Sequence, residues 1–250
     1  MQFFELICKA YLKRDIEFKS SFEVISKFIS FVISNGDFKD LHFGKGFKHY
    51  VFKSFYPLEK DKIYKKGETY EFTIRSLSED LIDYLSNALR ENINNPNFQV
   101  LTTTKRVVKQ HFITELYTLS PTIVSISQGK FWTMEQSGDI LLLQRLLHDN
   151  LEKKYNDFYK LKLNPIQNFI QLLEIKNRKP QNILISKNGK SIRFFGNKFR
   201  IIPHEDDVSQ KLAFMALGAG LGEKNSFGGG FLVSRSLTTV NRSLGKGVMV

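Results

Sequence analysis

Residues Ala216 to Phe231 read A-L-G-A-G-L-G-E-K-N-S-F-G-G-G-F and hold six of the 16 glycines of the chain. Glycine has no Cβ atom, so such a segment can adopt positive φ angles and bring its N–H groups close to a phosphate. Nucleotide-binding loops, however, follow a strand and open a helix, whereas this segment follows a helical pattern over 208–217. Neither G-x-G-x-x-G nor G-x-x-x-x-G-K-S/T is matched, which disfavours a nucleotide-binding enzyme.

Within this segment, residues 220–230 fit the pattern G-x-G-E-K-N-S-x-G-x-G. The pattern resembles the C-terminal glycine-rich signature of the RAMP superfamily, and most closely that of the sixth Cas family, the endoribonucleases that process CRISPR repeats. Two further segments match in the same order: L-H-F-G-K-G-F-K at 41–48, and L-S-P at 119–121 ahead of a predicted hairpin. The resemblance implies two ferredoxin-like domains and CRISPR precursor RNA as the substrate.

The charge balance suits a polyanionic partner. The net charge is +12, the isoelectric point is near 9.6, and residues 119–250 carry 19 basic against 10 acidic side chains. Nucleic acid or an acidic membrane surface would fit this surplus, and the alternative is a solvated basic surface without a ligand. The single cysteine, Cys8, lies in an apolar run and indicates a buried thiol in a reducing compartment. Because the N-terminus lacks a signal-peptide layout and no run approaches 18 apolar residues, we expect a cytoplasmic protein and no membrane partner.

Residues 1–118 predict a ferredoxin-like domain. Ser20 and Glu23 form a capping-box pattern at the start of a helix that ends at 35–36, and Ser78 caps a second helix. The order is β-α-β-β-α-β with one extra strand. Aromatic and β-branched residues predict the strands at 2–10, 50–56, 69–75, 98–103 and 107–117.

Residues 119–235 predict a second unit of the same kind, and 236–250 a loose tail without periodicity. The predicted fold class is therefore α+β, with tandem ferredoxin-like domains whose antiparallel sheets carry helices on one face. The turn Asn188-Gly189 predicts a hairpin within the β-rich stretch 169–202. The other expected elements are a hairpin at 121–127 and 130–134 and helices at 138–158 and 205–217.

His42 is the strongest candidate for acid–base chemistry. It lies just after the first predicted helix, beside the glycine-bracketed Lys45 and six residues before Lys48. An imidazole with a pKa of about 6.5 exchanges a proton near neutral pH, and nearby ammonium groups can hold a scissile phosphate. The His-x5-Lys arrangement of the family falls on His42 and Lys48, so the resemblance assigns catalysis to these two residues. Lys45 is added from its charge and position, and His49 stays open as a second catalytic histidine.

The reaction that the resemblance implies is metal-independent RNA cleavage, in which a 2′-OH attacks the adjacent phosphate to give a 2′,3′-cyclic phosphate and a 5′-OH. His42 acts as general base or general acid, both roles being open, and Lys48 stabilises the pentavalent phosphate. Some family members carry a tyrosine where this chain has Ser26-Lys27-Phe28, so either Lys27 supplies a charge there or the role is absent. No metal-ligand spacing occurs, and no metal or cofactor is expected.

The best stretch for RNA binding is 176–200, which holds eight basic residues and no acidic ones. Basic side chains engage phosphates, and aromatic faces stack on unpaired bases, although strand phenylalanines lie in cores more often than on binding platforms. Backbone and side-chain hydrogen-bond donors of the glycine-rich segment would add contacts to phosphates or base edges. The candidate RNA-binding residues are Lys187, Lys190, Arg193, Lys198, Arg200, Gly222, Lys224, Asn225 and Ser226.

Two further alternatives concern other RNA-binding proteins. A RAMP subunit that binds CRISPR RNA without cutting it is the first, and the pair His42 and Lys48 argues against it. A tandem RRM-like protein is the second, and the aromatic RNP-type strand that it requires is missing. The expected partners are CRISPR repeat RNA and other subunits of a CRISPR effector complex, and the protein is expected to be a monomer or a homodimer. The remaining histidines, His111, His148 and His204, are interpreted as structural.

Overall fold

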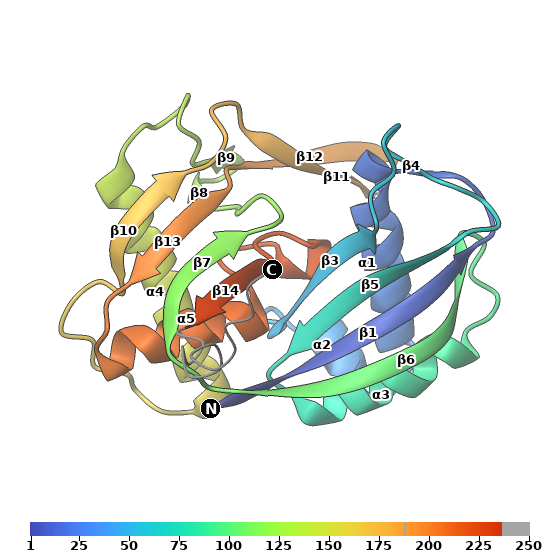
Figure 1. The fold of residues 1–250 in the computed structure, drawn as a ribbon, viewed down its shortest axis with the longest axis horizontal. Helices are drawn as coiled ribbons and strands as arrows, with labels where there is room; N and C mark the ends of the chain where they lie inside the picture. Colours follow the sequence, from blue (N-terminus) through green and yellow to red (C-terminus); the bar gives the residue numbers. More distant parts are fainter. Residues whose placement is uncertain (188, 237–250) are drawn as a thin grey trace, which may run out of the picture.

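The first half of the chain forms a four-stranded antiparallel sheet with two helices on one face (Figure 1). The computed structural model describes residues 1–187 and 189–236. The strand order β3-β5-β1-β6 and the chain order βαββαβ define a ferredoxin-like unit. Its elements are β1 (Gln2–Leu12), α1 (Phe18–Ser34), β3 (Tyr50–Tyr56), β5 (Thr69–Ser76), α3 (Glu79–Glu91) and β6 (Phe98–Lys109), with the short β2 (Ile16–Glu17), α2 (Lys39–Phe43) and β4 (Ile63–Tyr64) in the connections.

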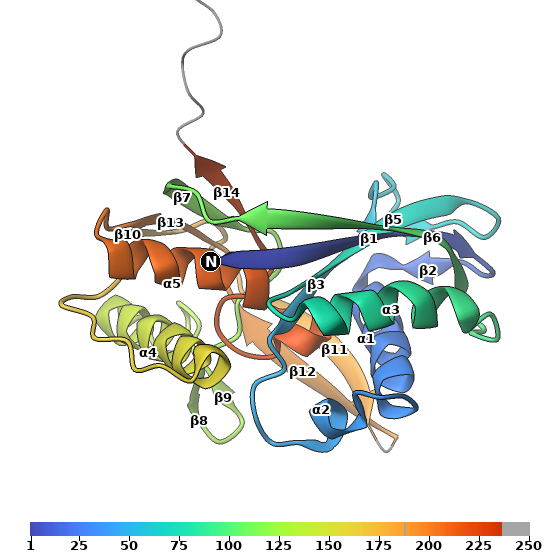
Figure 2. The same cartoon turned by 90° about the horizontal axis from the view of Figure 1, so that it is seen from below.

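The second half repeats this arrangement, with the strand order β10-β13-β7-β14. Its elements are β7 (Ile113–Thr118), α4 (Ile140–Tyr159), β10 (Ile170–Ile175), β13 (Phe199–Pro203), α5 (Asp207–Ala219) and β14 (Leu232–Ser236). Figure 2 shows the helices of both halves on the same side of their sheets, so the predicted α+β class with tandem ferredoxin-like units is confirmed. Among the helices of the described residues, none combines the length and the apolar character that a membrane crossing requires.

Two hairpins interrupt the second unit. One consists of β8 (Ser125–Ser127) and β9 (Lys130–Phe131), and the other of β11 (Gln181–Lys187) and β12 (Lys190–Gly196). The hairpin β11–β12 crosses to the first unit, where Ile183, Ile185 and Phe194 lie in the same buried cluster as the apolar face of α1. The second half of the chain therefore completes the core of the first.

Strand β1 contributes to both cores, because one of its faces is buried along the whole strand and Phe3, on the other face, reaches the core of the second unit. Leu6 and Cys8 are fully buried in the cluster beneath α1 and α3. Phe3 points the other way and packs against Phe214 of α5, with 5.1 Å between the ring centroids. A one-residue shift of β1 would move Leu6 and Cys8 to the face on which Lys9 is exposed, so the register of this strand is strongly specified.

The passage between the two sheets lies at 110–112, earlier than the boundary expected at 118–119. Strand β6 is continuous to Lys109 because all of its residues except Leu101, which lies at a β-bulge, pair with β1, whereas the sequence pattern predicts a break at 104–106. Strand β7 was expected in the first unit but pairs with β13 and β14 of the second. Its first residue, Ile113, is fixed by two backbone hydrogen bonds with the side chain of Gln210.

Other local expectations also differ from the structure. Helix α1 begins at Phe18 without a side-chain cap, so Ser20 and Glu23 lie inside the helix and form no capping box. Glu23 instead accepts a hydrogen bond of 2.7 Å from the backbone N–H of Ser186 on β11, which ties α1 to the crossing hairpin. Ser236, expected in the tail, ends β14, and the rest of that tail and Asn188 of the predicted turn lie outside the described residues.

Arg75 of β5 joins the two units. Its Nε donates to Glu5 Oε2 over 2.8 Å within the first sheet, and its Nη1 donates to the carbonyl oxygen of Leu232 over 2.7 Å in the second. The guanidinium carbon lies 4.4 Å from the ring centroid of Phe231, and both charged side chains are largely buried. A buried guanidinium with an ionic, a backbone and an aromatic partner is a specific link between the sheets.

Replacement of Arg75 should therefore cost much of the stability. Arg75→Ala leaves the buried Glu5 carboxylate without its ion-pair partner, and we expect the free energy of unfolding to fall by about 3 kcal/mol. Urea unfolding measures this change. The matched control is Arg90→Ala on α3, because Arg90 is exposed and bonds only within its own helix, so its effect should stay within about 0.5 kcal/mol. Equal effects of the two substitutions would contradict the assigned role.

Candidate functional site

His42 lies in the last turn of α2, a helix of five residues that the sequence pattern does not predict. The helix closes with a hydrogen bond of 2.8 Å from the N–H of Gly44 to the carbonyl oxygen of Asp40. The imidazole is exposed and packs edge-on against Phe43, with ring centroids 4.9 Å apart. An exposed imidazole on a short helix between two loops is accessible to a large substrate.

Lys48 holds the C-terminal end of α2. Its ammonium donates to the carbonyl oxygens of Leu41, His42 (3.0 Å) and Gly44 (2.8 Å). Partial burial lowers the pKa of Lys48. The structure thus brings Lys48 to the backbone of His42 and not to its ring, so Lys48 sets the position of the imidazole through the helix that carries it.

His42 lines a cleft of about 350 Å³ between α1, α2, β11 and the segment 225–227, which we call the His42 cleft. Lys27 of α1 lies across this cleft and pairs with Glu23 at 2.7 Å. The pair leaves Lys27 largely exposed, so its ammonium can reach a ligand in the cleft. The other described residues that line the cleft are Ser26, Ser30, Phe31, Ser34, Ile185, Ser186 and Phe227.

A second cleft of about 440 Å³ adjoins the first at Phe227, which lines both. We call it the glycine-loop cleft, because one wall is the segment 220–230, the glycine loop. Lys45 and Lys48 line this second cleft, together with His49 and Lys154. The three predicted catalytic residues are therefore distributed over two adjoining clefts, with His42 in one and both lysines in the other.

The glycines of the loop serve its own tight packing. The N–H of Leu221 donates to the carbonyl oxygen of Gly230 over 2.9 Å, which brings the two ends of the loop together. Gly230 has φ +68°, and a Cβ atom there would collide with the carbonyl oxygen of Leu221. Only glycine satisfies both the left-handed conformation and the close approach of the two backbones.

Lys154 of α4 lies beneath this loop and was not singled out by the sequence analysis. Its buried ammonium donates three hydrogen bonds of 2.7 Å, to the carbonyl oxygens of Gly220 and Gly222 and to Oδ1 of Asn225. Burial lowers the pKa of Lys154 to about 7, and the Glu223 carboxylate opposes this shift. Each ammonium hydrogen thus has an acceptor, as a buried charge requires. The sequence does carry one signal that Lys154 is buried. This lysine lies on the apolar stripe of its helix, three residues after Leu151 and directly before Tyr155.

The predicted RNA contacts of the glycine loop divide into two groups. Asn225 is buried, and its Nδ2 donates to the carbonyl oxygens of Leu221 (3.2 Å) and Gly229 (2.9 Å), so its amide faces into the loop. The carbonyl oxygen of Gly222 likewise accepts a hydrogen bond from the ammonium of Lys154. Lys224 is partly exposed in the glycine-loop cleft, and its ammonium lies 5.5 Å from the ring centroid of Phe194. Ser226 lines the same cleft.

The basic stretch 176–200 spreads over several strands. Lys190 and Arg193 are exposed on β12, and Lys187 ends β11. Lys198 is half-buried, which lowers its pKa. Arg200 forms ion pairs with Glu115 and, at 3.4 Å, with Glu174. Of the interleaved phenylalanines, Phe194 and Phe199 are buried and Phe195 is half-buried.

The other histidines have contacts of their own. His49 lies 2.7 Å from Asp157 (Nε2 to Oδ2), and burial lowers its pKa while Asp157 raises it. Its Nδ1 is buried and has no hydrogen-bond partner among the described residues. His148 Nδ1 accepts from the N–H of Phe169, and His111 Nε2 lies 3.3 Å from Ser234 Oγ. Within 1–187 and 189–236, no three His, Cys, Asp or Glu side chains gather as a metal site would require.

Comparisons with known proteins point to one family. Residues 103–233, just over half of the chain, match the family model described as CRISPR associated protein Cas6, C-terminal. The CRISPR-associated endoribonuclease Cas6 2 of Methanocaldococcus jannaschii is 27% identical over 239 residues, which cover 88% of this chain and 95% of that protein.

Two solved structures share the fold. A structure named CRISPR associated protein Cas6 has a TM-score of 0.68 at 20% identity and covers 94% of this chain and 100% of its own. Another, named as a RAMP protein binding different RNA substrates, has a TM-score of 0.67 at 17% identity, with coverages of 93% and 100%. At sequence identities this low, the similarity to the two structures shows a shared fold and no more.

Lys154 should be essential for the glycine loop. Lys154→Met removes the donor of three buried acceptors, and we expect the free energy of unfolding to fall by about 3 kcal/mol. The adjacent Lys153 is exposed, so Lys153→Met should change it by less than about 0.5 kcal/mol. Urea unfolding compares the two variants. A loss as small as that of Lys153→Met would show that the loop does not depend on the ammonium.

The contribution of Lys154 should also depend on pH. The pKa of Lys154 is about 7 in the folded protein against an ordinary value of 10.5, so between these values the unfolded chain binds more protons at this residue. The free energy of unfolding contributed by Lys154 therefore rises with pH above about 7, by at most about 1.4 kcal/mol per pH unit. The difference in free energy of unfolding between wild type and Lys154→Met, measured from about pH 6 to pH 9, should grow in this direction. A difference that shrinks with pH would contradict the lowered pKa.

Proposed function

The chain belongs to the Cas6 family of CRISPR-associated proteins, and from this membership we propose that it is an endoribonuclease that cuts CRISPR precursor RNA within its repeats. The relative from M. jannaschii is named an endoribonuclease, and one protein of similar fold is named for binding RNA. In this chain, the exposed imidazole of His42 in a cleft beside the glycine loop is the observation that supports the proposal most directly.

In the proposed reaction, the 2′-oxygen of the nucleotide before the cut bonds to the adjacent phosphorus, and the bond from phosphorus to the 5′-oxygen breaks. The 2′-OH loses a proton to a base and the 5′-oxygen gains one from an acid, so the products are a 2′,3′-cyclic phosphate and a 5′-OH. His42 fills one of these two roles. Its accessible ring is suited to either one, because imidazole exchanges a proton near neutral pH.

Lysines supply the positive charge in this proposal. The phosphate gains negative charge as the 2′-oxygen adds, and fixed cations stabilise that charge. Lys27 faces the cleft that holds His42, and Lys45 is exposed beside the adjoining one. Lys48 also lies close to His42 in the chain, but its three carbonyl partners favour a positioning role. No metal ion is needed in this scheme.

We propose that the RNA continues from the His42 cleft along the glycine loop and the hairpin β11–β12. Lys224 and Ser226 would contact it in the glycine-loop cleft, and Lys190 and Arg193 on the exposed hairpin. Asn225 and Gly222 would support the loop from within, because their polar groups already have partners there. Arg200 is held by two carboxylates and is a weaker candidate.

Cleavage of a labelled repeat RNA in the presence of EDTA tests the activity and its independence of metal. Wild type should make one cut and leave a 2′,3′-cyclic phosphate, identified by end-group analysis. His42→Ala should retain binding and lose about 10²–10⁴ in rate, the usual worth of a positioned acid or base. His204→Ala is the matched control, because His204 lines neither cleft, and it should cleave like wild type.

Three results would argue against the proposal. Cleavage at the normal rate by His42→Ala would remove the imidazole from the mechanism. Loss of wild-type cleavage in EDTA, with recovery on adding Mg²⁺, would refute metal independence. Binding without cleavage by wild type would favour a RAMP protein that binds CRISPR RNA without cutting it.

A further inference from the structure

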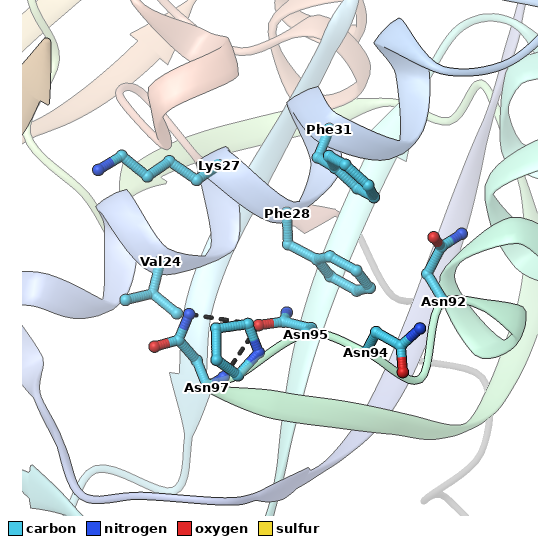
Figure 3. A pocket seen from close by; sticks show the side chains of 9 residues that line it. Val24, Lys27, Phe28, Phe31, Asn92, Asn94, Asn95 and Asn97 are labelled. Atoms are coloured by element: carbon cyan, nitrogen blue, oxygen red, sulfur yellow. Dashed lines mark hydrogen bonds between the residues drawn. The ribbon is translucent and has the colours of Figure 1, made fainter. Parts of the chain in front are cut away.

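A third pocket, of about 320 Å³, lies on the other side of α1 and is lined by four asparagines (Figure 3). One wall consists of Val24, Lys27, Phe28 and Phe31 of α1. The opposite wall is the loop between α3 and β6, from which Asn92, Asn94, Asn95, Pro96 and Asn97 contribute. We call it the asparagine pocket.

The wall formed by α1 is apolar and aromatic. Phe28 is 5% exposed and forms the floor, whereas Phe31 is 54% exposed, so much of its ring is accessible from outside the protein. Figure 3 shows both rings reaching from α1 toward the asparagine loop. A flat ring that is accessible at the edge of a pocket offers a surface on which a planar ligand can stack.

The opposite wall presents carboxamides that are only partly engaged. Asn95 Oδ1 accepts from the N–H (3.0 Å) and Nδ2 (3.2 Å) of Asn97, while Nδ2 of Asn95 is buried with no partner among the described residues. Nδ2 of Asn92 donates to the carbonyl oxygen of Ala88 over 2.7 Å, and Asn94 is exposed. A buried amide without a partner is rare in folded proteins and indicates a missing acceptor.

The loop that carries these amides is held in place. The ammonium of Lys13 donates to the carbonyl oxygens of Ile93 (2.5 Å) and Asn95 (3.0 Å). The backbone N–H of Lys13 donates to the carbonyl oxygen of Asn97 (2.9 Å). Three hydrogen bonds from one residue of the neighbouring β1–β2 connection fix the backbone of the loop. Ordering the amides on binding therefore costs little entropy.

The asparagine pocket and the His42 cleft are neighbours on α1. Lys27 and Phe31 line both, so the two cavities lie on either side of one ridge of α1. None of the described residues that line the asparagine pocket is acidic, and Lys27 lines it while its ammonium pairs with Glu23 on the side of the His42 cleft. A ligand that passes from the His42 cleft over this ridge would meet an ammonium, an exposed aromatic ring and then a set of amides.

We propose that the asparagine pocket binds one unpaired nucleobase of the RNA next to the cut site. The base stacks on Phe31, the amides of the loop pair with its edge, and Lys27 contacts its phosphate. A nucleobase is planar and has both donors and acceptors on its edge, which carboxamides match because they carry both groups. The inference rests on the proposed RNA cleavage and adds a site that reads the sequence of the repeat.

The test replaces each nucleotide of the repeat in turn by an abasic one and measures binding to wild type, Phe31→Ala and Asn94→Ala. Wild type should bind roughly 5- to 100-fold more weakly when the base that occupies the pocket is missing, the range expected for one stacked base. In both variants this penalty should disappear at that position and persist elsewhere. Phe112→Ala is the matched control, because Phe112 is also an exposed phenylalanine (38%) but lines none of the three cavities, and it should keep the wild-type pattern.

The result also separates this inference from the proposed function. If wild type cuts the repeat but Phe31→Ala retains every abasic penalty, the pocket does not bind a base, whereas the nuclease assignment stands. If wild type neither binds nor cuts the repeat, the proposed function fails and the pocket assignment fails with it. Phe31 is largely exposed and Asn94 is exposed, so both variants should fold.

Discussion

The buried ammonium of Lys154 is the interaction on which the arrangement of the site depends. It is fixed on α4 of the second unit, yet its three acceptors all belong to the loop that faces the first unit. A buried amine that is cut off from water must keep its hydrogen-bond acceptors, so the loop cannot move away from α4 without a cost in free energy. The loop in turn meets α1, where Ser26 Oγ donates to the carbonyl oxygen of Ser226 over 2.9 Å.

This loop explains how residues far apart in the chain form one continuous surface. Phe227 sits where the His42 cleft and the glycine-loop cleft meet, and Phe31 and Lys27 continue the surface into the asparagine pocket. Three cavities are thus linked by shared lining residues, from the glycine loop to the far side of α1. Such an arrangement suits an extended ligand better than a compact one, because each cavity takes only a part of it.

Much of the fold could be predicted because its signals are local. Periodicity and turn residues indicate both helices and most strands of each unit, and the glycine signature identifies the family. The end of β6 and the partner strands of β7 could not be predicted, because strand pairing is decided by residues that are distant in sequence. Among the site residues, His42 could be found as an exposed histidine near lysines. The only signal for Lys154 is its position on the apolar stripe of α4, and Asn95 could not be found, since an asparagine in a turn looks ordinary until its buried surroundings are known.

The crossing hairpin has a consequence for the order in which the protein forms during synthesis. Ile183, Ile185 and Phe194 cover part of the core beneath α1, but they are made after the whole first sheet has left the ribosome. At about 5–20 residues per second, the nascent first half carries an uncovered apolar face for several seconds. Molecular chaperones that recognise exposed apolar surface would meet this chain in that interval. The interval ends when the hairpin of the second half covers the apolar face.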